Sequence, residues 1–376
     1  MAFALTGARI FDGDSFRDGH AVVIDGARIT SVALSRELPA GMAKHDLGGG
    51  LLAPGFIDVQ VNGGGGALLN DAPSVDTVAR IATSHRKFGT TGLLPTVITD
   101  APEVTLAAID AVRAARAMGV PGVLGIHIEG PFLDVARKGA HAAQFIRDMT
   151  EADADQLAAA DCGAIMLTLA PNRVRPELIR RLASKGVLVS LGHAEATAVE
   201  AQTALAAGAR AFTHLFNAMS QLNGREPGMV GAALTDDESF VGLIADGHHA
   251  HDLALKLALR AKRHDRIMLI TDAMPAAAGG PDHFTLQGRK VSRKDGRLEL
   301  DDGTLAGSDL TMDSAVRYCV LKLGAGLAGA LRMASLAPAR FLRRDHELGR
   351  IAPGYLASLV HLGEDLNALQ TWIDGK

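Results

Sequence analysis

Four ionisable side chains stand at the ends of short apolar runs that are far apart along the chain. Glu129 follows GIHI, His193 follows SLG, His214 ends RAFTH and Asp272 follows LIT. A carboxylate and two neutral imidazoles form an ordinary ligand set for a catalytic divalent ion that keeps one position open for water. Such an ion lowers the pKa of water and so makes hydroxide available near neutral pH. A further carboxylate must take up the proton and pass it to a leaving group, and Asp272 is placed for this role.

These four residues can meet only if the ends of their strands are brought together. Strands that alternate with helices pair in parallel, and eight such units favour a closed (β/α)8 barrel over an open doubly wound sheet. In a barrel the carboxyl ends of all strands meet at one mouth, which would also hold Gln60 and Asn62 from the first run. The predicted strands are 56–61, 91–98, 122–128, 164–170, 186–192, 210–214, 240–245 and 266–271, most of them separated by segments with helical apolar spacing.

Each of these residues also has a purely structural explanation. A single histidine at a strand end is more often a hydrogen-bonded structural residue than a ligand, and Glu129 could cap the turn that follows it. All four fall at the predicted mouth and none at the opposite end of the barrel. Their joint placement therefore favours a metal site.

Both ends of the chain have a different pattern from the middle. The first fifty residues are short apolar alternations broken by Asp-Gly, Gly-Gly and Pro-Gly, and LGRIAPGYLASLVHL with LQTWIDGK repeats this character at the C-terminus. We therefore predict a small β-sandwich domain made of residues 1–53 and 346–376, attached to a catalytic barrel of residues 54–345.

Composition narrows the classes of function and the compartment. The 376 residues carry 38 basic and 42 acidic side chains, a net charge of -4, so we expect neither nucleic acid nor a membrane as a partner. We find no signal peptide and no uncharged run of the roughly 20 residues that span a bilayer, which predicts a cytoplasmic protein. Cys162 and Cys319 lie in apolar stretches and are expected to be buried, reduced thiols. The NGGGG run at 62–66 lacks the lysine and Ser/Thr of a phosphate loop and predicts a tight turn.

The motifs, in their order along the chain, resemble the N-acetylglucosamine-6-phosphate deacetylases of the amidohydrolase superfamily. EGPF, THLFNAM and GREPG separate that family from other amidohydrolases, whereas LGRIAPGYLASLV is widespread in the superfamily. The matching segments are PGFIDVQVNGGGG, GIHIEGPFL, RKGAHAAQF, SLGHAEAT, THLFNAMS, GREPG, IADGHHAHD, LITDAMPAAAGG and DDGTLAGSDLTMDSAVR.

The resemblance implies roles for individual residues at the metal. Glu129, His193 and His214 match the metal ligands of the family, and Asp272 matches its catalytic acid/base. Many amidohydrolases have His-x-His on the first strand, where this chain has Gln60-Val61-Asn62. The members of the family that share Gln-x-Asn bind one metal, so we expect one divalent ion per chain, with Gln60 and Asn62 at its periphery. Zinc is the metal expected from the ligand set, and Fe2+, Co2+ or Mn2+ would fit similar ligands.

The resemblance also implies how a substrate would be held. His141 would contact the acetyl carbonyl and stabilise the developing oxyanion. Asn217, the backbone of Ala218, Arg225 and His249 would bind the phosphate of N-acetylglucosamine 6-phosphate, which would be split into acetate and glucosamine 6-phosphate. One phosphate contact in this family can come from a neighbouring subunit, so a homodimer is expected. Without the resemblance, His141 reads equally well as a loop residue on the surface, and Arg225 reads better as a solvated loop residue.

Two other interpretations stay open at the level of the sequence. Another member of the superfamily, such as a cyclic amide hydrolase, a dipeptidase or a purine deaminase, would use the same barrel. The missing His-x-His, and the lack of an obvious strand-end lysine that could bridge two metals, argue against several of these. A barrel that binds or assembles without catalysis is the other alternative, and the presence of all four metal and acid/base candidates argues against it.

Overall fold

The centre of the molecule is a closed barrel of parallel strands. In this computed structural model, which describes residues 2–376, eight strands are paired in sequential order from β8 to β17. A β-bridge between Val61 and Ala273 and a 3.0 Å hydrogen bond from the Asp272 amide to the Gln60 carbonyl join the last strand to the first. The barrel prediction is confirmed, and the open doubly wound sheet is excluded. The strands are β8 (Phe56–Val61), β11 (Thr90–Ile98), β12 (Gly125–Glu129), β13 (Ala164–Leu169), β14 (Leu188–Leu191), β15 (Ala211–Phe212), β16 (Phe240–Leu243) and β17 (Ile267–Leu269).

Helices cover the outside of the barrel, and their starts can be explained from local sequence. Thr150 and Thr197 form capping boxes with the third residue of α3 and α5, and Ser74 caps α1. Because both faces of the sheet are covered, strands such as β8 and β11 are buried along their whole length. The α-helices are α1 (Val75–Arg86), α2 (Pro102–Ala117), α3 (Glu151–Ala158), α4 (Pro176–Ser184), α5 (Ala198–Ala206), α6 (Gly228–Thr235), α7 (Asp252–Ala261), α8 (Met312–Tyr318), α9 (Leu327–Ala334) and α10 (Leu336–Phe341), and a π-helical turn at Cys319–Leu323 follows α8.

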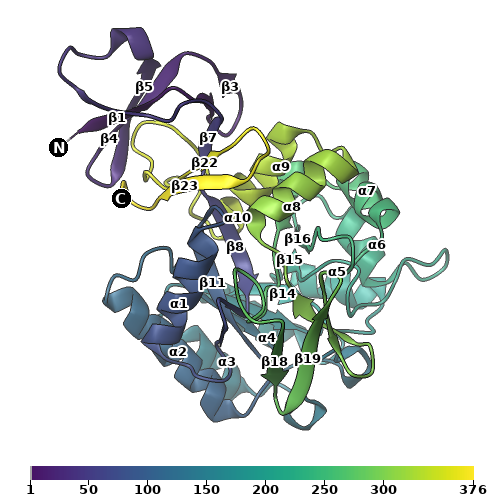
Figure 1. Ribbon diagram of the computed structural model, residues 1–376. Coiled ribbons are helices and arrows are strands. Elements are labelled where there is room, and N and C mark those ends of the chain that lie inside the picture. Colours follow the sequence, from purple (N-terminus) through teal and green to yellow (C-terminus); the bar gives the residue numbers. More distant parts are fainter. Residues whose placement is uncertain (1) are drawn as a thin grey trace.

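The two ends of the chain form one small β-domain, as predicted, above the barrel in Figure 1. Its sheets have the orders β5-β4-β1-β6 and β23-β22-β7-β2-β3, so strands from the C-terminus pair with β7 from the N-terminal segment. Leu5 and Val22 of one sheet share an apolar cluster with Leu52, Leu359 and Trp372 of the other, which makes the domain a sandwich. The boundaries at 53/54 and 345/346 stay a prediction. The strands are β1 (Phe3–Thr6), β2 (Arg9–Phe11), β3 (Phe16–Arg17), β4 (His20–Asp25), β5 (Arg28–Leu34), β6 (Ala43–Asp46), β7 (Leu51–Pro54), β22 (Leu359–Leu362) and β23 (Ala368–Trp372).

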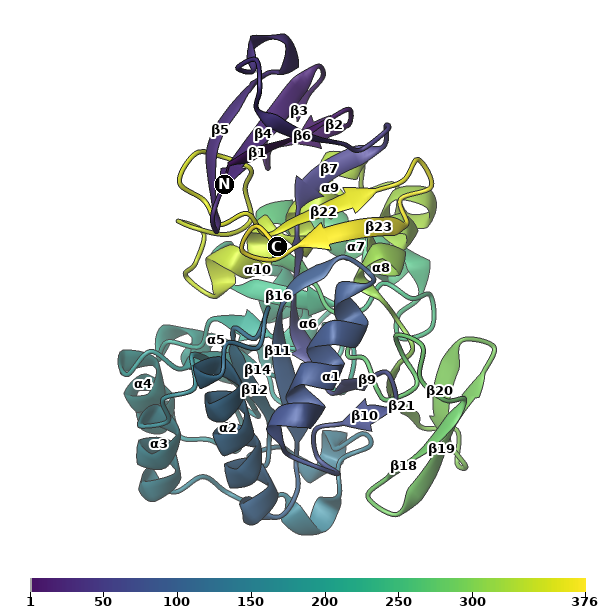
Figure 2. The ribbon, with the colours of Figure 1, turned by 60° about the vertical axis from the view of Figure 1, so that its left-hand side comes forward.

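An antiparallel meander after the last barrel strand was not predicted from the sequence. Its four strands project beside the barrel, below the small β-domain in Figure 2. They pack Leu286, Val291 and Leu298 against Met274 and Leu68 in an apolar cluster of their own. The strands are β18 (His283–Leu286), β19 (Arg289–Lys294), β20 (Arg297–Leu300) and β21 (Leu305–Ser308).

Three smaller predictions can also be compared with the structure. The NGGGG run forms a tight hairpin of β9 (Gly63–Gly64) and β10 (Ala67–Leu68), and the amide of Gly63 donates to the Ala273 carbonyl at 2.9 Å, next to Asp272. Cys162 and Cys319 are both free and buried. No helix within residues 2–376 is both long and apolar enough to cross a membrane.

Candidate functional site

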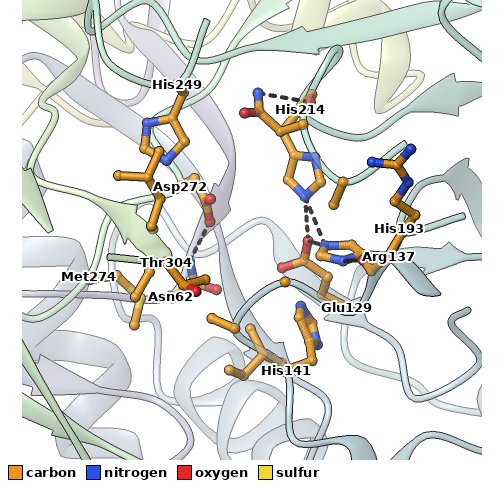
Figure 3. A pocket seen from close by; sticks show the side chains of 18 of the residues that line it. Asn62, Glu129, Arg137, His141, His193, His214, His249, Asp272, Met274 and Thr304 are labelled. Carbon is orange, nitrogen blue, oxygen red and sulfur yellow. Dashed lines mark hydrogen bonds and ion pairs between the residues drawn. The ribbon is translucent and has the colours of Figure 1, made fainter. Parts of the chain in front are cut away.

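Glu129, His193 and His214 converge at the carboxyl ends of β12, β14 and β15. The Oε1 atom of Glu129 lies 3.2 Å from Nε2 of His193 and 3.0 Å from Nε2 of His214, and the two Nε2 atoms are 3.0 Å apart. All three side chains are buried, with exposures of 2%, 5% and 4%. Figure 3 shows them on one wall of a pocket, with Asp272 and His249 on the other. The fold thus brings together three ligand types that are separated widely in sequence.

The arrangement of these atoms fits a divalent cation. Nδ1 of His193 lies 2.9 Å from the Arg137 carbonyl, which can only accept, so Nδ1 carries the proton and Nε2 of the neutral ring presents a lone pair. Two imidazole nitrogens and a carboxylate oxygen this close together repel one another unless a positive charge lies between them. Burial alone would raise the pKa of Glu129, but the two imidazole rings beside its Oε1 hold it well below its usual range. The buried group is therefore consistent with a metal site.

Asp272 faces this group with two amide side chains beside it. Nδ2 of Asn62 donates to Oδ1 of Asp272 at 2.6 Å, and Nε2 of Gln60 donates to the same oxygen and to Oε1 of Glu129, each at 3.2 Å. Burial, with the negative charge of Glu129, raises the pKa of Asp272 to about 6. Gln60 and Asn62 thus turn their nitrogens, not their oxygens, toward the carboxylates, and they lie at the periphery of the group.

The backbone at the site adopts a conformation that L-residues avoid. The φ angles of His193, His214 and Asp272 are 49°, 31° and 53°, all in the left-handed region. This region costs on the order of 1 kcal/mol for a residue with a side chain and persists where the surroundings impose it. Three of the four residues singled out from the sequence are therefore held in a strained backbone conformation two or three residues after their strands end.

His141 lines the same pocket, which has a volume of about 430 Å³. Its ring packs edge-on against His193 with the ring centres 4.4 Å apart, and its Nδ1 lies 2.8 Å from the hydroxyl of Thr99. Burial, helped by the neighbouring His193, lowers the pKa of His141 to about 3, so the ring is neutral. A neutral imidazole has one N–H to donate, and its position decides what the ring can do.

Three of the four residues predicted to bind phosphate line this pocket: Asn217, Ala218 and His249. Nδ1 of His249 is 2.6 Å from Oδ2 of Asp246, and the His249 amide donates to the other oxygen of that carboxylate at 3.0 Å. His248 is exposed, and His251 caps α7 through a hydrogen bond from the Leu253 amide. Among the histidines of DGHHAH, His249 is thus the one that reaches the pocket.

Arg225 is not brought to the pocket of its own chain. It lies in an exposed segment, 221–226, before α6, and does not line the cavity. The cationic side chain on the pocket wall is instead that of Arg137, which is paired with Glu195. The role of Arg225 in binding phosphate stays a prediction.

The sequence reasoning missed three polar residues that support the site: Asp58, Thr99 and Asp246. Asp58 is fully buried in β8, where Oδ1 accepts from the Gln60 amide at 3.1 Å and Oδ2 accepts from the Thr271 hydroxyl at 2.5 Å. Thr99 and Asp246 each follow a predicted strand directly, so the rule that singled out Glu129 would have found them too. Asp58 lies two residues before Gln60 and so on the same strand face, which was an available signal.

Comparisons with known proteins agree with this architecture. A model described as the amidohydrolase family matches residues 51–376, and one described as the NagA composite domain matches residues 2–52. An N-acetylgalactosamine-6-phosphate deacetylase from Shewanella sp. (strain ANA-3) is 42% identical over 98% of this chain and 94% of its own length. An N-acetylglucosamine-6-phosphate deacetylase from Haemophilus influenzae is 35% identical over 100% of this chain and 99% of its own length. The crystal structure of N-acetylglucosamine-6-phosphate deacetylase from Pasteurella multocida superimposes with a TM-score of 0.97 at 36% identity, covering 100% of this chain and 99% of that one.

Proposed function

The chain belongs to the amidohydrolase family, and from this premise we propose that it hydrolyses the acetamide of an N-acetylhexosamine 6-phosphate to acetate and the free amino sugar phosphate. The observation that carries the proposal is the buried group of Glu129, His193 and His214 opposite Asp272 in one pocket. The names of the relatives at 42% and 35% identity, both hexosamine-6-phosphate deacetylases, support the substrate class.

Glu129, His193 and His214 would hold one divalent cation. When bound, such an ion lowers the pKa of water and polarises a carbonyl oxygen. We expect zinc from the nitrogen and oxygen ligands, with Fe2+, Co2+ and Mn2+ as alternatives. A second ion is not expected, because Gln60 and Asn62 direct amide nitrogens toward Asp272 and the Gln60 nitrogen also faces Glu129.

Asp272 would move the proton. Both amide hydrogen bonds end on Oδ1, which leaves Oδ2 free of donors within residues 2–376. Oδ2 would take the proton from the attacking water and return it to the amide nitrogen, so that the amine leaves in neutral form. His141 would donate a hydrogen bond to the acetyl oxygen, where negative charge develops in the transition state.

Phosphate would be recognised on the other wall, by His249, Asn217 and the backbone of Ala218. Nδ1 of His249 is hydrogen-bonded to the carboxylate of Asp246, and this bond holds the ring at the pocket wall. Holding the phosphate away from the reacting carbon orients the acetamide and so assists the chemical step.

Arg225 would act on the pocket of a partner subunit. Its exposed segment lies outside the pocket of its own chain, whereas its planar fork suits a phosphate. We therefore propose a homodimer in which Arg225 of each chain contributes to the substrate pocket of the other chain.

We propose N-acetylglucosamine 6-phosphate as the substrate, on the motifs of the family that the chain resembles. The 4-epimer, N-acetylgalactosamine 6-phosphate, is a second candidate because the relative at 42% identity carries that name. The two sugars differ only in the orientation of one hydroxyl, and both present the same acetamide and phosphate.

The test is acetate release from both hexosamine 6-phosphates and from their unphosphorylated forms, with metal content measured on the same sample. We expect about one metal per chain and turnover only of phosphorylated sugars, and the ratio of the two kcat/KM values assigns the epimer. No release from either phosphate by protein that contains one metal per chain would exclude this substrate class while leaving the metal site intact.

A further inference from the structure

Thr99 joins the pocket to the strand that carries Glu129. It follows β11 directly, is 1% exposed, and places its hydroxyl 2.8 Å from Nδ1 of His141 and 3.2 Å from the backbone carbonyl of Glu129. A side chain at position 130 would collide with this hydroxyl, since a Cβ there would lie 2.1 Å from it, but Gly130 has none. The Thr99 carbonyl accepts from Nε2 of Gln287, in the meander, at 2.8 Å. The position of the hydroxyl is therefore fixed from several sides.

The hydroxyl has one proton for two neighbours. If it donates to the Glu129 carbonyl, it must accept from Nδ1–H of His141, and the neutral ring then turns a lone pair at Nε2 toward the pocket. If it donates to Nδ1, the ring proton lies on Nε2 and can be donated to an acetyl oxygen. Only the second arrangement stabilises an oxyanion. The 2.8 Å contact to Nδ1 has the usual length of a hydroxyl hydrogen bond, whereas the 3.2 Å contact to the carbonyl is longer than O–H···O bonds usually are, which favours this second arrangement.

We propose that Thr99 is a positioning residue that holds His141 in the tautomer with the proton on Nε2. This inference rests on the proposed function, in which His141 donates to the substrate carbonyl. His141 has no carboxylate on its ring that could select a tautomer, because the only side-chain hydrogen bond recorded for it within residues 2–376 is the one to Thr99. The Thr99 hydroxyl is therefore the group that selects between the two tautomers of His141, of which only the one with the proton on Nε2 can donate to the substrate.

Kinetics of the metal-loaded enzyme test the role of the hydroxyl. Thr99→Val keeps the shape and removes the hydroxyl, and we expect kcat to fall about 10- to 1,000-fold, with KM and metal content within about twofold of the wild type. Thr99→Ser should recover most of that loss. Thr90→Val is the matched control, since Thr90 lies at the other end of β11 and its buried hydroxyl has no partner within the described residues. Equal losses in Thr99→Val and Thr99→Ser, or loss of metal, would overturn the proposal.

A double-mutant comparison separates positioning from general support. In a His141→Asn background, Thr99→Val should change kcat less than about twofold, because the ring that it positions is gone. A loss in that background as large as in the wild type would mean that Thr99 acts only on the fold.

The tautomer can also be measured without turnover. In the zinc form, the 15N signals of His141 should show the proton on Nε2 in the wild type and in Thr90→Val, and on Nδ1 or on both nitrogens in Thr99→Val. A proton on Nδ1 in the wild type would refute the inference even if the enzyme is active. If no hexosamine phosphate is hydrolysed but the tautomer follows Thr99, the proposed function fails and the positioning inference stands.

Discussion

At the scale of single residues, hydrogen-bond partners fix the orientation of both Asp272 and His249. Asn62 and Gln60 both donate to Oδ1 of Asp272, which leaves Oδ2 for the proton transfer that we propose. His249 is hydrogen-bonded to Asp246, whose carboxylate holds the ring at the wall where we propose that the phosphate binds. Both arrangements can be tested by single substitutions. Substitution of Asp272 tests the proposed proton transfer, and substitution of Asp246 tests the proposed binding of phosphate.

Asp272→Asn should keep its metal and lose most of its turnover. An amide cannot accept the proton of the attacking water, so we expect kcat to fall on the order of 10²- to 10⁴-fold. The measurement is acetate release together with metal analysis, with the exposed Asp301→Asn as a control. Full activity of Asp272→Asn would remove Asp272 from the reaction.

Asp246→Asn should weaken binding of the phosphate more than the chemical step. Asparagine retains an acceptor for His249 but bonds the ring less strongly than a carboxylate does, so the ring is held less firmly and we expect kcat/KM for phosphorylated substrate to fall about tenfold, chiefly through KM. Exposed Asp237→Asn should behave as the wild type. If kcat alone fell, His249 would have a role in catalysis instead of phosphate binding.

At the scale of elements, the site is built where the barrel closes. Asp58 on β8 binds the hydroxyl and the amide of Thr271, the residue before Asp272, and also the amide of Gln60. One buried carboxylate thus joins the first strand to the segment after the last one. The closure of the barrel and the position of Asp272 are therefore linked.

Asp58→Ala should destabilise the protein and reduce activity together. Three buried donors would lose their acceptor, at about 1–3 kcal/mol for each unsatisfied group, and we expect the thermal midpoint to fall by about 5 °C or more. Calorimetry of the metal-loaded protein measures the midpoint, with exposed Asp161→Ala as the control. An unchanged midpoint would show that the closure of the barrel between β8 and the segment after β17 does not depend on Asp58.

At the scale of the whole molecule, the pocket of one chain contains His249 and Asn217 but not Arg225. If a second chain supplies Arg225, mixed dimers should behave differently from either parent. A dimer of Arg225→Ala with Asp272→Asn has one site that combines an intact Asp272 with an intact Arg225 from the other chain. Its second site carries both substitutions.

Co-expression of these two impaired variants should therefore restore up to about half of the wild-type activity per dimer. We expect Arg225→Ala alone to lose about 2–3 kcal/mol in kcat/KM for phosphorylated substrate, the value of a charged hydrogen bond. Differently tagged chains allow the mixed dimer to be isolated and assayed beside each homodimer. No recovery in the mixed dimer would place Arg225 in its own chain's site or outside the reaction.

Much of this protein is decided by local sequence. Apolar runs of strand length alternate with amphipathic helical segments, and this alternation predicts the barrel because parallel strands need helical crossovers. Glu129, His193, His214 and Asp272 could be singled out because each ends such a run or follows it directly, and the carboxyl ends of barrel strands face one mouth. The Asp-Gly and Pro-Gly turns at both ends likewise predict the small β-domain.

Other features depend on contacts between segments that are far apart in sequence. The meander of β18 to β21 could not be predicted by the barrel rule, because it lies outside the alternation and forms its apolar cluster with distant residues that include Leu68, Ile98 and Met274. The absence of Arg225 from its own pocket, the pairing of Thr99 with His141 and the bond from Asp58 to Thr271 are likewise invisible in a single sequence. A side chain's type and its place at a strand end are local properties, but the atom that it faces depends on how the barrel closes. The sequence by itself therefore determined which residues could do the chemistry, and the tertiary structure alone decided which partners orient them.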